Sequence, residues 1–171
     1  MTIYNYLREA RSGTLPQQGC DDADHKSGHM AATLRRMSEG APVAKFDVLL
    51  SKRAPQPSSA YSQGLVFGDL VVTSGYLGTK PDGSGLVSGG FEAELRQALD
   101  NVTAVLKEAS CAWADVIRIN VSLVDISKFA EMDRIFRDYA REPYPTRNTI
   151  SVKELWGGAQ VGIDVWAVRS Q

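Results

Sequence analysis

Residues 91–109 read FEAELRQALDNVTAVLKEA, a pattern that predicts a long amphipathic α-helix. Apolar side chains recur there at spacings of three and four residues, so a helix would align them in one stripe. The members of this stripe are Phe91, Leu95, Leu99, Val102, Leu106 and Ala109. Such a stripe must be covered by a sheet or by another helix, and the segments on either side are expected to supply that cover.

Alternating apolar and polar side chains at residues 116–124 predict a half-covered strand directly after this helix. A second amphipathic helix is expected at about residues 127–141. Gly68-Asp69 separates two β-prone runs and is typical of a hairpin turn, and the glycine-rich residues 78–90 predict a loop. Further strands are expected at residues 46–50, 62–67, 70–75, 149–152 and 160–169. This order predicts an α+β domain with both helices packed on one face of one sheet.

The face of the last predicted strand that points away from the helices carries Gly162, Asp164 and Trp166. That face requires either solvent or another subunit as its cover. The large apolar side chain of Trp166 favours another subunit.

The first 44 residues look unlike the rest of the chain. A polar run with glycine, proline, aspartate and both histidines is typical of an extension or a linker, so the folded domain is expected at residues 45–171. Residues 27–30, Ser-Gly-His-Met, are typical of a cloning junction before a start methionine, which leaves open whether all of this segment is native. Residues 31–38 have the pattern of a short helix.

The composition is that of an ordinary globular protein, with 43% hydrophobic and 23% charged residues. Nineteen basic and 20 acidic residues give a net charge of −1 without a basic run, which argues against a nucleic-acid partner. Cys20 and Cys111 are the only cysteines, and this usage is typical of a reduced, cytoplasmic protein. Both histidines precede the domain, so we expect no Cys/His metal site, and no apolar run is long enough to span a membrane.

Arg147 is the first candidate for a functional residue. Pro143 and Pro145 restrict the backbone before it, so the preceding helix must end and the chain must reach Arg147 in an extended conformation. A stiff approach holds the guanidinium in place, and its planar donors match a carboxylate two at a time. We therefore interpret Arg147 as a carboxylate anchor; the competing interpretation is a surface ion pair with Asp133 or Asp164.

Five short motifs resemble, in order and spacing, the Rid family of reactive intermediate deaminases, also called YjgF-like. They are Ala54 to Gly64, Val72 to Gly75, Gln97 to Val102, Val121 to Asp125, and Pro145-Thr146-Arg147. The resemblance covers residues 45 to 169. It implies a chorismate-mutase-like α+β subunit with a mixed sheet and two helices on one face, assembled as a homotrimer with clefts between subunits.

The resemblance also implies a chemistry and a set of residues. Family members hydrolyse enamine or imine intermediates to a 2-keto acid and ammonia, without a metal or an organic cofactor. Arg147 matches the family's carboxylate-binding arginine, and Tyr61 and Ser74 match positions that line the cleft. The backbone at Thr149 lies where the family offers further hydrogen bonds to the ligand. The implied partner is thus a small carboxylate.

The sequence departs from the family pattern at several of these positions. Gly162 stands where deaminases of this type carry the glutamate that positions the attacking water. Asp164 lies two residues further along the same strand face, about 6 to 7 Å away, and is the candidate to replace it as a catalytic group. Asp133 stands where asparagine is common, Tyr76 where glutamine follows Ser-Gly, and Thr149 where many members have cysteine. These changes predict an altered substrate, an altered reaction or lost catalysis.

Three functions therefore stay open. The first is a hydrolase of a carboxylate-bearing imine or enamine, with Arg147 as the anchor. The second is a trimeric protein that binds small carboxylates without catalysis. The third keeps the anchor but uses Asp164 or Tyr76 to move protons in an isomerase or lyase reaction. A ribonuclease activity, described for some relatives, has little support in this neutral chain without a catalytic histidine pair.

Overall fold

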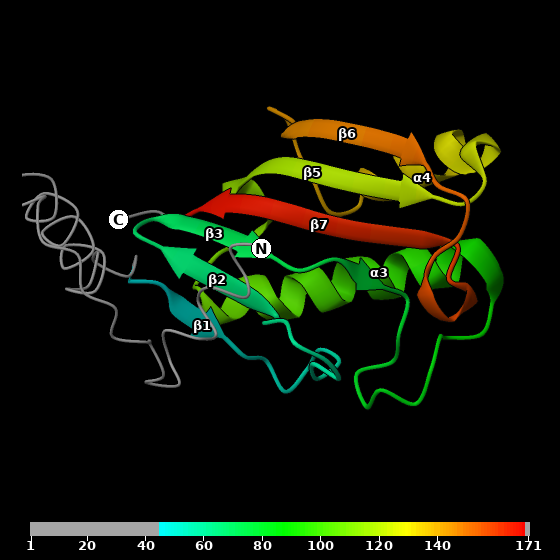
Figure 1. The fold of residues 1–171 in the computed structure, drawn as a ribbon. Helices are drawn as coiled ribbons and strands as arrows, with labels where there is room; N and C mark the ends of the chain where they lie inside the picture. Colours follow the sequence, from blue (N-terminus) through cyan, green and yellow to red (C-terminus); the bar gives the residue numbers. More distant parts are fainter. Residues whose placement is uncertain (1–44, 170–171) are drawn as a thin grey trace, which may run out of the picture. The chain divides into compact units, whose positions relative to one another are not determined.

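The computed structural model describes residues 45–169, so the expectations for residues 1–44, including Cys20 and both histidines, lie outside the described part. The described chain forms a mixed sheet with two α-helices (Figure 1). The strands are β1 (Asp47–Leu49), β2 (Gly64–Phe67), β3 (Leu70–Thr73), β4 (Tyr76–Leu77), β5 (Val116–Leu123), β6 (Thr146–Ser151) and β7 (Val161–Val168). The helices are α3 (Gly90–Glu108) and α4 (Phe129–Phe136).

The strand order is β1-β2-β3-β7-β5-β6, and the short β4 pairs with β7. β5 and β6 run parallel, while the other pairs are antiparallel. The hairpin between β2 and β3 pairs Phe67 with Leu70, and Gly68 in its turn has a φ of 60°, a left-handed conformation that glycine adopts without strain. This result confirms the turn predicted at Gly68-Asp69.

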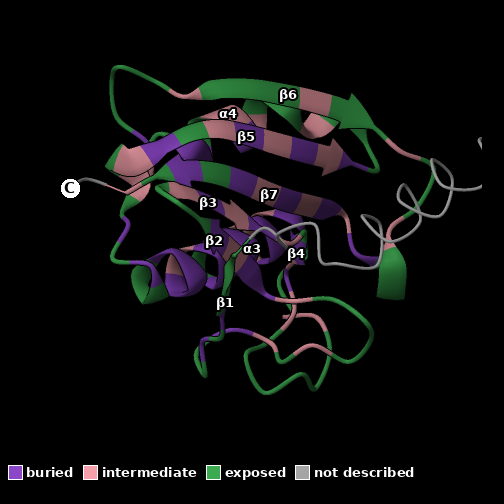
Figure 2. Ribbon diagram, turned by 60° about the vertical axis from the view of Figure 1, so that its left-hand side comes forward, coloured by how far each residue is buried: buried purple, intermediate pink, exposed green. Residues whose placement is uncertain are grey.

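Helix α3 confirms the prediction for residues 91–109 to within one residue at each end. Its stripe is buried, with Leu95, Leu99 and Val102 fully inaccessible. The helix packs against the sheet, chiefly on β7, and contacts α4, and both helices lie on the same side of the sheet (Figure 1). Along β7 and β5 buried residues alternate with more accessible ones, as predicted for strands covered on one face (Figure 2).

The bounds predicted for two elements were wrong. The helix expected at residues 127–141 is shorter, because Ile126–Lys128 forms a 3₁₀ turn and α4 ends at Phe136. Phe129 also leaves the expected apolar face and is 42% exposed. The strand expected at residues 149–152 begins instead at Thr146, because parallel pairing with β5 starts there. Arg147 is therefore the second residue of β6, an edge strand.

The strand register determines which side chains share a face of the sheet. Arg147 is paired with Ile119, and Ile119 is buried on the helix side. Asn148 and Asp164 are both paired with Asn120, which is the next residue along β5. Because successive residues of a strand point to opposite faces, Arg147 points toward the helices and Asp164 points away from them.

A close approach between Gly78 and α3 fixes the start of the long loop that was predicted for residues 78–90. The Asn101 side chain donates to the backbone oxygens of Leu77 at 3.1 Å and Thr79 at 2.8 Å, one residue on each side of Gly78. The loop also contains one isolated bridge, between Thr79 and Leu86. Within residues 45–169, no helix has the length and apolar character required to cross a bilayer.

Candidate binding site around Arg147

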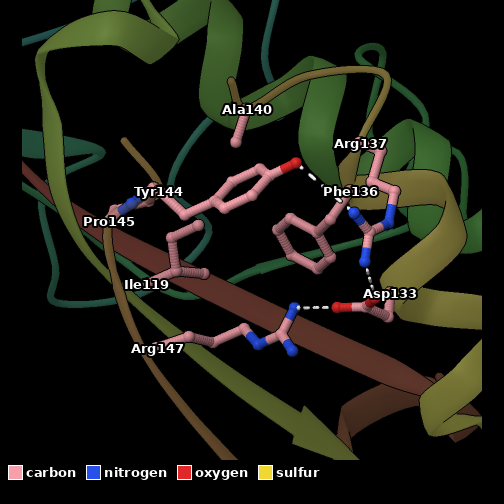
Figure 3. Close-up of a pocket in the computed structure, with 8 residues that line it drawn as sticks. All are labelled: Ile119, Asp133, Phe136, Arg137, Ala140, Tyr144, Pro145 and Arg147. Carbon is pink, nitrogen blue, oxygen red and sulfur yellow. Dashed lines mark hydrogen bonds and ion pairs between the residues drawn. The ribbon is translucent and has the colours of Figure 1, made fainter. Parts of the chain in front are cut away.

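A pocket of about 200 Å³ lies between α4, β5 and the segment that leads into β6 (Figure 3). Its walls combine two arginines and one carboxylate with a larger number of apolar side chains. The lining residues are Ile119, Asp133, Phe136, Arg137, Ala140, Tyr144, Pro145 and Arg147. Arg147 thus lies in a concave site, as expected for a ligand anchor.

The Arg147 guanidinium is held from several directions. Its Nη1 is 2.9 Å from Oδ1 of Asp133 in an ion pair. The central guanidinium carbon lies 5.2 Å from the ring centre of Phe129 and 5.7 Å from that of Phe136, within the range of cation–π attraction. The side chain is 25% exposed, so it is held in place but remains open to a ligand.

Asp133 links two arginines. Its second oxygen accepts a hydrogen bond from Arg137 Nη2 at 2.9 Å, and Arg137 in turn lies 3.4 Å from the Tyr144 hydroxyl (Figure 3). Hydrogen bonding to Arg147, followed by that to Arg137 and the charges of both, holds the pKa of Asp133 below its usual range. Two cations and one anion leave a net positive charge, which favours binding of a further anion.

The competing interpretation of Arg147, an ion pair with Asp133, therefore describes a real contact. The contact does not exclude an anchor role, because a guanidinium presents five N–H donors and the Asp133 pair uses one edge of it. An ion pair on one edge also orients the other donors. Asp133 is thus a positioning residue for Arg147.

Thr149 lies two residues after Arg147 on the same face of β6. It is paired with Val121, a buried residue on the helix side of β5. Its hydroxyl oxygen is buried and has no hydrogen-bond partner among the described residues. A buried hydroxyl without a partner is uncommon in folded proteins and is a candidate contact for a ligand or a water molecule.

Two further predicted site residues point to the opposite face. Oδ1 of Asp164 accepts a hydrogen bond from the Asn120 side chain at 2.7 Å. A side chain built at Gly162 would lie 3.3 Å from Leu77 and 3.7 Å from Leu155, so its surroundings are apolar. Within one chain, neither residue shares a face of the sheet with Arg147.

Tyr61, Ser74 and Tyr76 come from the segments around β2 and β4, not from the pocket wall. Tyr61 is 46% exposed, and the Ser74 hydroxyl donates to the backbone oxygen of Ser62 at 2.6 Å. Tyr76 is 5% exposed and its hydroxyl donates to the backbone oxygen of Gln63 at 3.1 Å. Burial, together with the neighbouring Tyr61, raises the pKa of the Tyr76 hydroxyl. Tyr76 is thus buried and hydrogen-bonded within this chain, and its contact with substrate stays a prediction.

Of the eight residues that line the pocket, sequence reasoning named only Arg147 and Asp133 as site residues, and it missed the other six, among them Arg137, Ala140 and Tyr144. Arg137 carried a usable signal, because it lies four residues after Asp133 on a predicted helix and opposite charges at this spacing pair. Ala140 and Tyr144 carried none, because both follow the end of α4 in a segment whose path depends on where β6 pairs.

Replacing Asp133 with asparagine is expected to flatten the loss of stability at acid pH. The folded-state pKa of Asp133 is depressed, so its stabilising contribution is present above its unfolded pKa of about 3.9 and is lost as the pH falls through the lower folded value. Melting temperatures measured from pH 7 to pH 2 test this. The wild-type curve should fall more steeply below about pH 4 than that of Asp133→Asn, and Asp47→Asn, at an exposed site on β1, is the control. Parallel curves for wild type and Asp133→Asn would contradict the prediction.

The fold and this pocket define an α+β domain with an arginine-centred site suited to a small anion. The chain belongs to the family described as Endoribonuclease L-PSP, whose family model matches residues 51–169. Family membership, which the curated relatives and solved structures also support, confirms the resemblance to Rid proteins.

Among curated proteins, the chain is 32% identical to human 2-iminobutanoate/2-iminopropanoate deaminase over 122 residues, which cover 71% of this chain and 89% of the relative. It is 34% identical to a RutC family protein of Aquifex aeolicus over 119 residues, covering 68% and 94%. Among solved structures, RidA from an Antarctic Psychrobacter is 33% identical with a TM-score of 0.69, covering 72% of this chain and 99% of that one. Escherichia coli TdcF with bound serine is 28% identical with a TM-score of 0.66 and the same coverage.

Proposed function

We propose that this protein hydrolyses a carboxylate-bearing imine or enamine to a 2-keto acid and ammonia, with Arg147 holding the carboxylate. The observation that carries the proposal is the Arg147 guanidinium, held by Asp133 and two aromatic rings at the wall of an open pocket. The curated relatives named as imine deaminases support the reaction class.

Anchoring and orientation are most of what this reaction requires. The carbon of a protonated imine is already electrophilic, so a fixed carboxylate and a nearby water molecule supply much of the rate enhancement. The substrate carboxylate binds the guanidinium donors that Asp133 does not use. Asp133 itself is a weak base here, because two arginines stabilise its ionised form.

The bond changes follow from the substrate. The water oxygen bonds to the imine carbon, and a water proton moves to the nitrogen to give a carbinolamine. The carbon–nitrogen bond then breaks and the hydroxyl proton is transferred to the departing nitrogen, so that the oxygen becomes the carbonyl and nitrogen leaves as ammonia, or as ammonium when the imine was protonated. The Thr149 hydroxyl is buried without a partner on the Arg147 face, although Thr149 is not among the residues that line the pocket. It is our candidate to hydrogen-bond the water or the imine nitrogen once a ligand is bound.

Thr149→Val tests this assignment, because valine keeps the shape and removes the hydroxyl. We expect kcat to fall about tenfold, because the variant loses one hydrogen bond to the reacting groups that contributes roughly 1 to 1.5 kcal/mol. The folded state should be as stable as wild type or more stable, since an unpaired buried hydroxyl is removed. Steady-state kinetics and thermal melting measure the two effects. A variant with unchanged kcat would remove Thr149 from the site.

Gly162 stands where related deaminases carry a glutamate, and we propose that this difference changes the surroundings of the bound substrate. Gly162 offers no carboxylate, and its neighbours Leu77 and Leu155 are apolar.

We further propose a homotrimer, because Gly162 and Asp164 lie on the sheet face opposite Arg147 and could approach it only from a second chain. Trp166 and Val168, each 41% exposed on that face, support a subunit contact. Light scattering tests the assembly, and the mass of a single chain would contradict it.

A coupled assay tests the reaction. An amino-acid oxidase generates imines from a range of amino acids, semicarbazide traps the imine that remains, and the loss of trapped product reports hydrolysis. Wild-type protein should lower semicarbazone formation for at least one substrate in proportion to its concentration. No effect with any substrate would contradict the proposed reaction.

Gly162 supports one alternative, a protein that binds small carboxylates without turning them over. The coupled assay distinguishes the binding protein from the hydrolase. The binding protein would show calorimetric titration with 2-keto acids, abolished in Arg147→Ala, but no effect in the coupled assay.

A further inference from the structure

We propose that the apolar part of the Arg147 pocket receives the substrate side chain and selects imines of amino acids with large apolar side chains. This inference rests on the proposed function, because it takes Arg147 as the carboxylate anchor. It adds a substrate class that the proposed function leaves open.

The pocket has a polar part and an apolar part. Asp133 and Arg147 meet along one side, whereas the Tyr144 ring, the Phe136 ring and Ile119 line the space beside the guanidinium (Figure 3). Pro145 and Ala140 complete this apolar part. A ligand whose carboxylate lies on Arg147 therefore has apolar surface within reach of the groups attached to its α-carbon.

The size of the pocket favours a side chain larger than methyl. Its volume is about 200 Å³. For comparison, an apolar cavity of about 150 Å³ in another protein accommodates benzene. A carboxylate and a methyl group would leave much of this space to water, whereas a branched aliphatic or aromatic side chain would fill it.

The charges at the pocket rim argue against charged substrate side chains. Arg137 is engaged by Asp133 at 2.9 Å and approaches the Tyr144 hydroxyl at 3.4 Å, and its guanidinium carbon lies 5.9 Å from the Tyr144 ring centre. A cationic side chain would meet two arginines. An acidic side chain would have to displace Asp133 from Arg137, because the positive charge of Arg137 is already paired with the Asp133 carboxylate.

Two pocket positions allow the inference to be tested. Tyr144 is 49% exposed, so Tyr144→Ala removes one wall with little risk to folding. Ala140→Leu fills the pocket instead, and because Ala140 is 4% exposed its folding must be checked by thermal melting. Phe67→Ala is the matched control, an aromatic residue that is 56% exposed on β2 and outside the pocket.

The measurement is the ratio of kcat/KM for the leucine-derived imine to that for the alanine-derived imine. We expect a wild-type ratio of at least about ten, since each methylene in an apolar pocket contributes a severalfold gain. Tyr144→Ala and Ala140→Leu should bring the ratio toward one, and Phe67→Ala should keep it. A wild-type ratio near one, or a ratio unchanged by Tyr144→Ala, would overturn the inference. The glutamate-derived imine is a further arm, and its preference over leucine would also overturn it.

The two proposals fail in different ways. If wild-type protein hydrolyses the alanine imine without a preference for leucine, the reaction stands and the side-chain pocket fails. If no imine is hydrolysed, the reaction fails, and calorimetry then compares 4-methyl-2-oxopentanoate with pyruvate. Tighter binding of the branched acid, lost in Tyr144→Ala, would support the pocket; equal binding or no binding of either acid would overturn it.

Discussion

Replacing Arg147 with alanine is expected to lower kcat/KM for the imine substrate by about 100-fold or more. Two hydrogen bonds between a guanidinium and a carboxylate, each of roughly 1.5 kcal/mol or more, correspond to at least that factor. The folded state should tolerate the change, because Asp133 retains Arg137 as a partner at 2.9 Å. The loss should therefore appear in kinetics and in keto-acid binding rather than in the amount of folded protein.

Two further variants make this experiment specific. Arg147→Lys keeps the charge but loses the planar pair of donors, so an intermediate loss is expected. Arg134→Ala removes the arginine of α4, whose side chain is 60% exposed and pairs with Glu92 at 3.1 Å outside the pocket. This control should retain kcat/KM within about twofold. Equal losses in Arg134→Ala and Arg147→Ala would show that the effect is one of general charge.

Replacing Gly78 with alanine should destabilise the protein far more than replacing Gly75 with alanine. The added methyl group would lie 2.6 Å from the Cα of Glu94 and 2.8 Å from its backbone oxygen. Both are backbone atoms of α3, so β4 or the helix must move. The movement would also strain the Asn101 hydrogen bonds to Leu77 and Thr79. We expect a loss of about 3 kcal/mol, equivalent to roughly 10 °C in Tm.

Gly75→Ala is the matched control, three residues earlier in the same segment. A methyl group there would have no atom within 4 Å, and the residue is exposed. We expect a change within about 1 kcal/mol, with a small gain possible because alanine restricts the unfolded chain. Thermal melting of both variants decides the matter. Similar melting temperatures would mean that β4 and α3 do not pack as closely as described.

Local periodicity predicted the central elements of the fold. The stripe in residues 91–109 and the alternation in residues 116–124 each repeat over enough residues to identify a helix and a strand, and α3 and β5 agree with them. The boundaries of α4 and β6 could not be predicted in the same way. They depend on the pairing of β6 with β5, which begins at Arg118 and Thr146, 28 residues apart in the chain.

The sequence identified Arg147 and Asp133 as candidate site residues, but it did not identify the rest of the pocket. The Pro-x-Arg motif identified the arginine, and the spacing of Asp133 and Arg137 on one helix carried the signal for their ion pair. The relation between Asp164 and Arg147 was not predictable, since their strands are separated by β5 and their faces depend on two registers. The sequence also could not predict that the Thr149 hydroxyl lacks a hydrogen-bond partner, because this depends on how the surrounding residues pack.

The most direct test of the central claim is a crystal structure of the protein with 4-methyl-2-oxopentanoate, the product of the leucine-derived imine. We predict that the keto-acid carboxylate lies within about 3 Å of the Arg147 guanidinium nitrogens, the usual distance of a charge-assisted hydrogen bond. The branched side chain should contact Tyr144 and Ala140. A ligand bound elsewhere, with Arg147 contacting only Asp133, would contradict the account.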